Sequence, residues 1–219
     1  MQTTDYISND IKALTANDKI GEAKKLFNEL TFTHLPVVEN DLLIGLIAET
    51  DVQAIDDENK LLKEYRYTFQ LFFTDEKTNW FELLKIFALN EATIIPVLDV
   101  HQKYIGYYEL TDILHIFNNT PFLSESGAIL VVSKEIQEYS FSEIAQIIES
   151  NDARVLGAFI SNSTKETVEI TIKLSDHDLN NTIQTFRRYN YSILTSFHLD
   201  EYLNTLKERS DYLQKYLNI

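Results

Sequence analysis

The feature that most restricts the possible folds of this chain is an internal repeat. Two stretches, HLPVVENDLLIGLIAETDV (34–52) and IIPVLDVHQKYIGYYELTDI (94–113), share a Pro-Val strand with an acidic residue, a polar turn, an apolar run around one glycine, and Thr-Asp. Self-similarity at a fixed spacing indicates repeated units that pack against one another. We therefore expect two copies of one small unit in the first half of the chain, paired around one common core.

The surroundings of the repeat show the elements of each copy. Apolar residues at helical spacing precede both stretches, and a short apolar helix follows each Thr-Asp. Each copy is thus predicted to read strand, helix, strand, strand, helix, with limits of about 5–57 and 66–118 in a domain of residues 1–120. The predicted fold class is α+β.

The repeated strand, its glycine and its terminal aspartate resemble a known family. On these marks, residues 5–118 resemble a tandem pair of cystathionine-β-synthase (CBS) domains, the Bateman module. The resemblance implies that an aspartate six residues after the glycine binds ribose hydroxyls, and that hydroxyl residues three and five after it lie near ribose or phosphate. The matching residues are Asp51 and Asp112 for the carboxylate, and Thr50 and Thr111 for the later hydroxyl. Ala48 and Glu109 replace the earlier hydroxyl.

The same resemblance implies a ligand and a cleft. The ligand would be AMP, ATP or a related adenosine compound, with no certain cofactor. The cleft lining would also include the residues before each proline, namely Thr33, His34, Leu35, Thr93, Ile94 and Ile95. Because a carboxylate at position 109 would repel phosphate, we expect the Asp51 cleft to accept a nucleotide and the Asp112 cleft to reject it. An alternative stays open, since Thr and Asp at a strand-to-helix junction are ordinary N-cap residues.

The second half of the chain has a different pattern. Strands at 128–133, 155–162, 168–174 and 191–197 alternate with helices at 141–150 and from Asp176 onward. This order, β-α-β-β-α-β, is the ferredoxin-like arrangement, and residues 127–198 resemble an ACT-type regulatory domain. The loop at 134–139 lacks the glycine that amino-acid-binding ACT domains usually carry. A CBS pair followed by an ACT-like domain resembles the acetoin-utilisation regulatory proteins in layout.

The end of the chain carries a leucine stripe. Residues 199–219 place leucines at helical spacing and predict a C-terminal helix. The stripe favours either a short coiled coil or a helix packed on its own chain.

Composition excludes several function classes. The net charge of −15 argues against nucleic acid and anionic membranes as partners. Cysteine is absent and the five glycines are scattered, which excludes thiolate chemistry and glycine-rich phosphate loops. No histidine pair has metal-site spacing, so we expect no metal and no catalytic residues. The chain shows no signal-peptide layout and no apolar run of membrane-spanning length, which predicts a cytoplasmic protein.

The sequence therefore predicts a non-catalytic regulatory or sensor protein. It would bind a small-molecule effector in a CBS cleft and form a homodimer, as a surplus of helix-borne aromatic residues suggests. The alternatives are a structural dimerisation scaffold, or an adaptor for a partner enzyme, in which the ligand clefts have degenerated.

Overall fold

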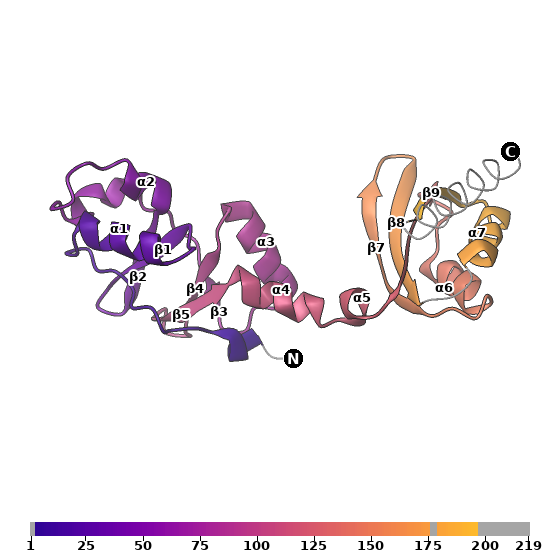
Figure 1. The fold of residues 1–219 in the computed structure, drawn as a ribbon, viewed down its shortest axis with the longest axis horizontal. Helices are drawn as coiled ribbons and strands as arrows, with labels where there is room; N and C mark the ends of the chain where they lie inside the picture. Colours follow the sequence, from indigo (N-terminus) through magenta and orange to yellow (C-terminus); the bar gives the residue numbers. More distant parts are fainter. Residues whose placement is uncertain (1–2, 176–178, 197–219) are drawn as a thin grey trace, which may run out of the picture. The chain divides into compact units, whose positions relative to one another are not determined.

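The computed structural model describes residues 3–175 and 179–196, and the chain divides into two compact units, Met1–Phe117 and Asn118–Ile219 (Figure 1). Each unit is described by itself below. The predicted C-terminal helix at 199–219 lies outside the described residues. The finer domain limits of the sequence analysis, 1–120, 127–198 and 199–219, stay predictions. Within the described ranges, no helix is long and apolar enough to cross a bilayer.

The first unit contains the two predicted copies. The first copy comprises η1 (Thr3–Tyr6), α1 (Ile20–Glu29), β1 (His34–Glu39), β2 (Leu42–Ala48), α2 (Glu49–Gln53) and η2 (Leu62–Thr68). The second comprises β3 (Thr74–Asp75), α3 (Trp80–Asn90), β4 (Ile94–Leu98), β5 (Tyr104–Glu109) and α4 (Leu110–Asn118). The hairpins β1–β2 and β4–β5 have equivalent registers, with His34 opposite Ala48 and Ile94 opposite Glu109. The repeat predicted from sequence is thus confirmed.

A short segment of each copy pairs with a strand of the other copy, β5 or β2. We call residues 7–10 and 69–72 the crossing segments. Ser8 of the first copy forms two 2.9 Å backbone hydrogen bonds with Tyr107 of β5. Gln70 bonds in the same way with Leu46 of β2, at 2.7 and 2.9 Å. Each crossing segment therefore completes the sheet of the other copy.

The interior of the first unit is divided. One cluster of buried residues belongs mainly to the first copy and also includes Ile94 and Tyr107 of the second. A separate cluster is formed by the second copy, with Tyr6 and Ile7 of the first packed against it. The prediction of one common core is wrong, because each copy buries its own helices on its own sheet. The crossing residues interlock the two clusters.

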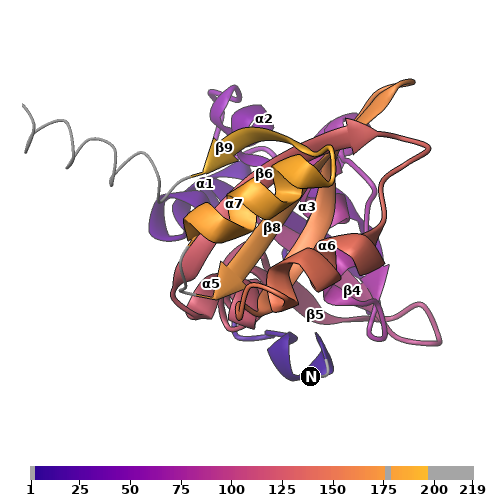
Figure 2. The same cartoon turned by 90° about the vertical axis from the view of Figure 1, so that its right-hand side faces the viewer.

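The second unit has the ferredoxin-like arrangement. It contains α5 (Pro121–Ser124), β6 (Gly127–Glu135), α6 (Phe141–Glu149), β7 (Val155–Ser163), β8 (Thr167–Ser175), α7 (Leu179–Arg188) and β9 (Ser192–Ser196). The antiparallel sheet has the order β7-β8-β6-β9, as the fold requires. Figure 2 shows α6 and α7 across one face of this sheet, where their apolar sides meet alternate residues of β6 and β8 in one core. The α+β prediction is confirmed.

Candidate functional site

Two predicted site residues join the copies of the first unit. Thr33 and Thr93 stand directly before β1 and β4, and the backbone N–H of each donates to the other's hydroxyl oxygen at 3.0 Å. The Thr33 hydroxyl also lies 2.8 Å from Nδ1 of His34. Because the two hydrogen bonds are reciprocal, they give this joint a local two-fold symmetry. The structure thus brings together the two segments that were predicted to line the clefts.

The Thr-Asp pairs lie in the first turns of helices. α2 begins at Glu49 after the N-cap residue Ala48, whose side chain makes no capping bond, and Asp51 follows within the first turn. Asp112 has the same place in α4, which begins at Leu110. The alternative interpretation of these aspartates as N-caps is therefore wrong. A carboxylate in the first turn is instead favoured by the positive end of the helix dipole.

The surroundings of Asp51 include a buried histidine. His34 is 5% exposed, and its ring meets Phe72 edge-on with 5.4 Å between the ring centres. Burial lowers the pKa of His34, while a hydrogen bond with Gln70 and the charge of Asp51 oppose this shift. The surroundings of Asp51 therefore include an imidazole, an amide and an aromatic ring.

The surroundings of Asp112 are more acidic. Burial raises the pKa of Glu109 at the end of β5, and the charges of Asp112 and Asp10 raise it further, while a hydrogen bond with Thr111 opposes the shift. Asp10 comes from the crossing segment 7–10, and its carboxylate accepts a 2.6 Å hydrogen bond from the Tyr107 hydroxyl. This bond lowers the pKa of Asp10. Glu109 therefore lies within electrostatic range of two further carboxylates, those of Asp112 and Asp10.

Several predicted site residues belong to the core. Leu35 is 1% exposed, Ala48 is 6% exposed, and Ile94 and Ile95 are fully buried. The side chains of these four residues offer almost no surface to a ligand. The hydroxyl residues Thr50 and Thr111 are exposed. The surface that remains for contact therefore lies at the beginnings of α2 and α4.

Sequence reasoning missed four residues of the two clefts: Asp10, Gln70, Phe72 and Tyr107. The first three come from the crossing segments, which join the neighbouring sheets through isolated bridges. No hydrophobic period marks a segment of that kind. Tyr107 lies next to the repeated glycine, and that position gives no sign of its hydrogen bond to Asp10.

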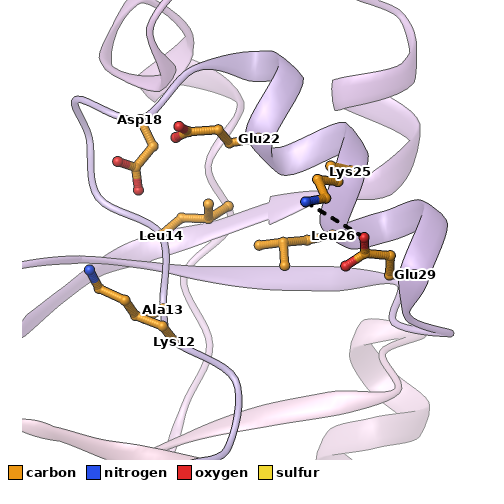
Figure 3. Close-up of a pocket in the computed structure, with 8 residues that line it drawn as sticks. All are labelled: Lys12, Ala13, Leu14, Asp18, Glu22, Lys25, Leu26 and Glu29. Carbon is orange, nitrogen blue, oxygen red and sulfur yellow. Dashed lines mark ion pairs between the residues drawn. The ribbon is translucent and has the colours of Figure 1, made fainter.

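A surface pocket of about 390 Å³ lies elsewhere on the first copy (Figure 3). Its lining consists of Lys12, Ala13, Leu14, Asp18, Glu22, Lys25, Leu26 and Glu29. Asp18 accepts the Thr15 backbone N–H at 2.7 Å, and Lys25 pairs with Glu29 at 3.9 Å. These polar groups are occupied by their own chain. None of the twelve predicted site residues lines this pocket, so it is distinct from the candidate clefts.

No group of three or more acidic or histidine side chains within the described ranges is arranged to hold a metal ion.

The two copies of the first unit can be compared with a known family. Residues 4–57 match the family model described as "CBS domain", and the second copy repeats the element order and the hairpin register of that segment. The first copy is therefore similar to a CBS domain, and the second copy has the same architecture as the first.

Individual relatives cover parts of the chain. An inosine-5'-monophosphate dehydrogenase of Methanocaldococcus jannaschii is 26% identical over 147 residues, which are 67% of this chain and 29% of that protein. The uncharacterised protein MJ1232 of the same organism is 32% identical over 111 residues, 50% of this chain and 37% of the relative. The chain thus spans about a third of the length of these curated relatives.

Solved structures show similar shapes over about half of the chain. A CBS domain pair/ACT domain protein from Thermotoga maritima has a TM-score of 0.48 and 18% identity, and the match covers 53% of this chain and 96% of that one. A structure titled as CBSX2 in complex with AMP has a TM-score of 0.46 and 17% identity, with 53% and 95% coverage.

Proposed function

We propose that this protein is a non-catalytic regulator that binds an adenosine nucleotide, AMP or ATP, in the cleft at Asp51. The observation that carries the proposal is the contrast between the clefts. The Asp51 carboxylate lies near the buried imidazole of His34, which also bonds with Gln70, whereas Asp112 lies near Glu109, which also feels the charge of Asp10. A ligand that carries a phosphate therefore meets less repulsion in the first cleft.

The chemistry of the first cleft suits a nucleoside with a vicinal diol. An ionised carboxylate accepts two hydrogen bonds, one from each hydroxyl of such a diol. The unpaired backbone N–H groups at a helix start favour an anion, and α2 begins two residues before Asp51. Ala48 in place of a hydroxyl costs one hydrogen bond, roughly 0.5–1.5 kcal/mol.

The second cleft has a larger obstacle. Two like charges at ~4 Å repel by about 4 kcal/mol at an effective dielectric constant of 20. Glu109 would face the phosphate in this way, so we expect uncharged adenosine to bind in the second cleft more tightly than AMP.

Calorimetry with AMP tests the assignment of the clefts. We expect wild type and Asp112→Ala to bind, Asp51→Ala to lose binding, and Glu109→Ser to gain binding in the second cleft. Loss of binding in Asp112→Ala but not in Asp51→Ala would contradict the assignment. Adenosine is the matched uncharged ligand, because it separates recognition of the nucleoside from repulsion of the phosphate.

In the proposed role the protein is a cytoplasmic homodimer, and its ligand shifts the packing of the copies. A ligand can do so only by binding one arrangement more tightly than the other. The second unit, which we propose to be an ACT-like domain, or a partner enzyme would respond to that shift.

A second candidate function is a structural scaffold or adaptor with degenerate clefts. The observation that favours it is the mutual bonding of Thr33 and Thr93, which occupies both hydroxyls within the protein. If neither wild type nor any of the three variants binds AMP, ATP or adenosine, the scaffold is the better explanation.

A further inference from the structure

The sheet of the second unit has one face opposite to the face that α6 and α7 cover. Val168, Ile170, Ile172 and Leu174 of β8 point toward α6 and α7 and are buried. The intervening residues of β8 point to the opposite face and are all half-buried. We call this opposite face the outer face. On it, the Phe122 ring of α5 packs against Phe159 at 5.7 Å between ring centres, so α5 covers only the β7 margin.

The strand register places one central row across the outer face. Thr171 of β8 lies opposite Phe159 of β7 and opposite Val131 of β6, and Val131 lies opposite Thr195 of β9. None of these four residues is charged. Two residues from Thr171 in either direction, β8 carries Glu169 and Lys173 on the same face.

The neighbours of these two charges within the sheet are neutral. Glu169 lies opposite Ser133 and Asn162, and Lys173 lies opposite Ile129 and Gly157. Neither Glu169 nor Lys173 forms a salt bridge with another described residue. The outer face therefore presents one positive and one negative group equally spaced about a neutral row, and a further carboxylate, Glu135, at the end of β6 opposite Thr167.

We infer that the outer face binds the same face of a second copy of this chain. Two such sheets stack about 10 Å apart with their strand directions nearly aligned. If the two-fold axis runs along the central row, β8 lies antiparallel on β8 of the second copy. Lys173 of each copy then faces Glu169 of the other, and Val131 meets its own counterpart.

Charge complementarity favours a second copy over other occupants. The chain carries a net charge of −15, so most surfaces of two copies repel each other. The centre of the outer face is locally neutral, since Lys173 balances Glu169, and this pair is complementary to itself under a two-fold rotation, which leaves Glu135 of each copy at the margin. Such self-complementarity is what an isologous interface requires.

The inference rests on the homodimer proposed above and assigns its contact surface. The test is a charge-swap cycle on the full chain, with mass measured by light scattering and the dissociation constant by sedimentation. Lys173→Glu and Glu169→Lys each place like charges opposite each other twice, so each should weaken the dimer at least about tenfold. The double variant reverses both signs and should restore the dissociation constant to near the wild-type value.

Two control variants complete the experiment. Glu149→Lys makes the same charge change as Glu169→Lys at an exposed position on α6, and it should leave the dimer unchanged. Phe81→Glu tests the exposed apolar side of α3 as the rival surface. The inference is overturned if both single charge variants dimerise like wild type, if the double variant fails to recover, or if Phe81→Glu alone abolishes the dimer.

A monomeric wild type would overturn the homodimer as well as its surface. AMP binding, measured separately on the same samples, tests the nucleotide-binding part of the proposed function. The two failures are therefore distinguishable.

Discussion

At the scale of single residues, His34 links the candidate nucleotide cleft to the stability of the fold. Burial lowers its pKa from the ordinary value of 6.5, so the unfolded chain binds a proton more readily than the folded chain. Its contribution to the free energy of unfolding is present above about pH 6.5 and is lost as the pH falls through the folded pKa. One proton gives a slope of at most about 1.4 kcal/mol per pH unit.

We expect His34→Gln to flatten the dependence of the free energy of unfolding on pH below about pH 6.5. Urea titrations at several pH values between 5 and 8 measure it. His101→Gln is the matched control, because His101 is exposed. If both variants keep the wild-type slope, the buried imidazole is not the titrating group.

A second residue-scale prediction concerns Thr182 of α7. Its hydroxyl is fully buried and has no hydrogen-bond partner among residues 3–175 and 179–196. A buried unpaired hydroxyl is unfavourable, so Thr182→Val should raise the free energy of unfolding by about 1 kcal/mol. Thr185→Val on the same helix is the control and should lower it, because the Thr185 hydroxyl donates to Asn181 at 2.9 Å. Equal effects of the two variants in urea unfolding would contradict the argument.

At the scale of elements, the glycine of the repeat is explained by the crossing segments. Gly106 has a φ of +150°, and a Cβ there would collide with the Ser8 carbonyl oxygen. Gly45 has a φ of +151°, and its Cβ would lie 2.8 Å from the Phe69 Cβ. The same residue thus recurs because each copy receives a strand from the other at this point.

Gly106→Ala is therefore expected to lower the free energy of unfolding by about 1–3 kcal/mol. Gly21→Ala is the control, because Gly21 has no positive φ and its Cβ would meet only Glu58, at 3.3 Å or more. Urea unfolding measures both. If Gly21→Ala lowers the free energy of unfolding as much as Gly106→Ala does, the close approach of the crossing segment does not explain the repeated glycine.

Elements with a clear hydrophobic period could be predicted from the sequence. The strand expected at 128–133 is β6 (Gly127–Glu135), and the helix expected at 141–150 is α6 (Phe141–Glu149). In β6 every second side chain is buried, and in α6 the buried side chains recur at helical spacing, so both elements leave a regular hydrophobic pattern in the sequence. The crossing segments and the place of Asp51 within a helical turn depend on contacts between distant residues, and such contacts leave no local period. Thr33 and Thr93 do lie together, but their reciprocal hydrogen bonds could not be predicted from the spacing of the repeat.

At the scale of the whole molecule, the two units have separate cores. We therefore expect calorimetric unfolding in two transitions. AMP at about 100 times its dissociation constant adds about 2.7 kcal/mol to the unit that binds it, which raises that transition by several degrees. Only the transition of the first unit should move, and Asp51→Ala should abolish the shift.

The transitions can be assigned with one core variant in each unit. Phe186 in the second unit is fully buried, and so is Leu83 in the first. Loss of such a side chain to alanine costs about 3–5 kcal/mol for Phe and 2–5 kcal/mol for Leu. Phe186→Ala should lower the temperature of the transition that AMP does not shift. Leu83→Ala should lower the temperature of the transition that AMP raises. A single transition that responds to both variants and to AMP would mean that the units unfold together, and that ligand binding in the first unit is felt directly by the second.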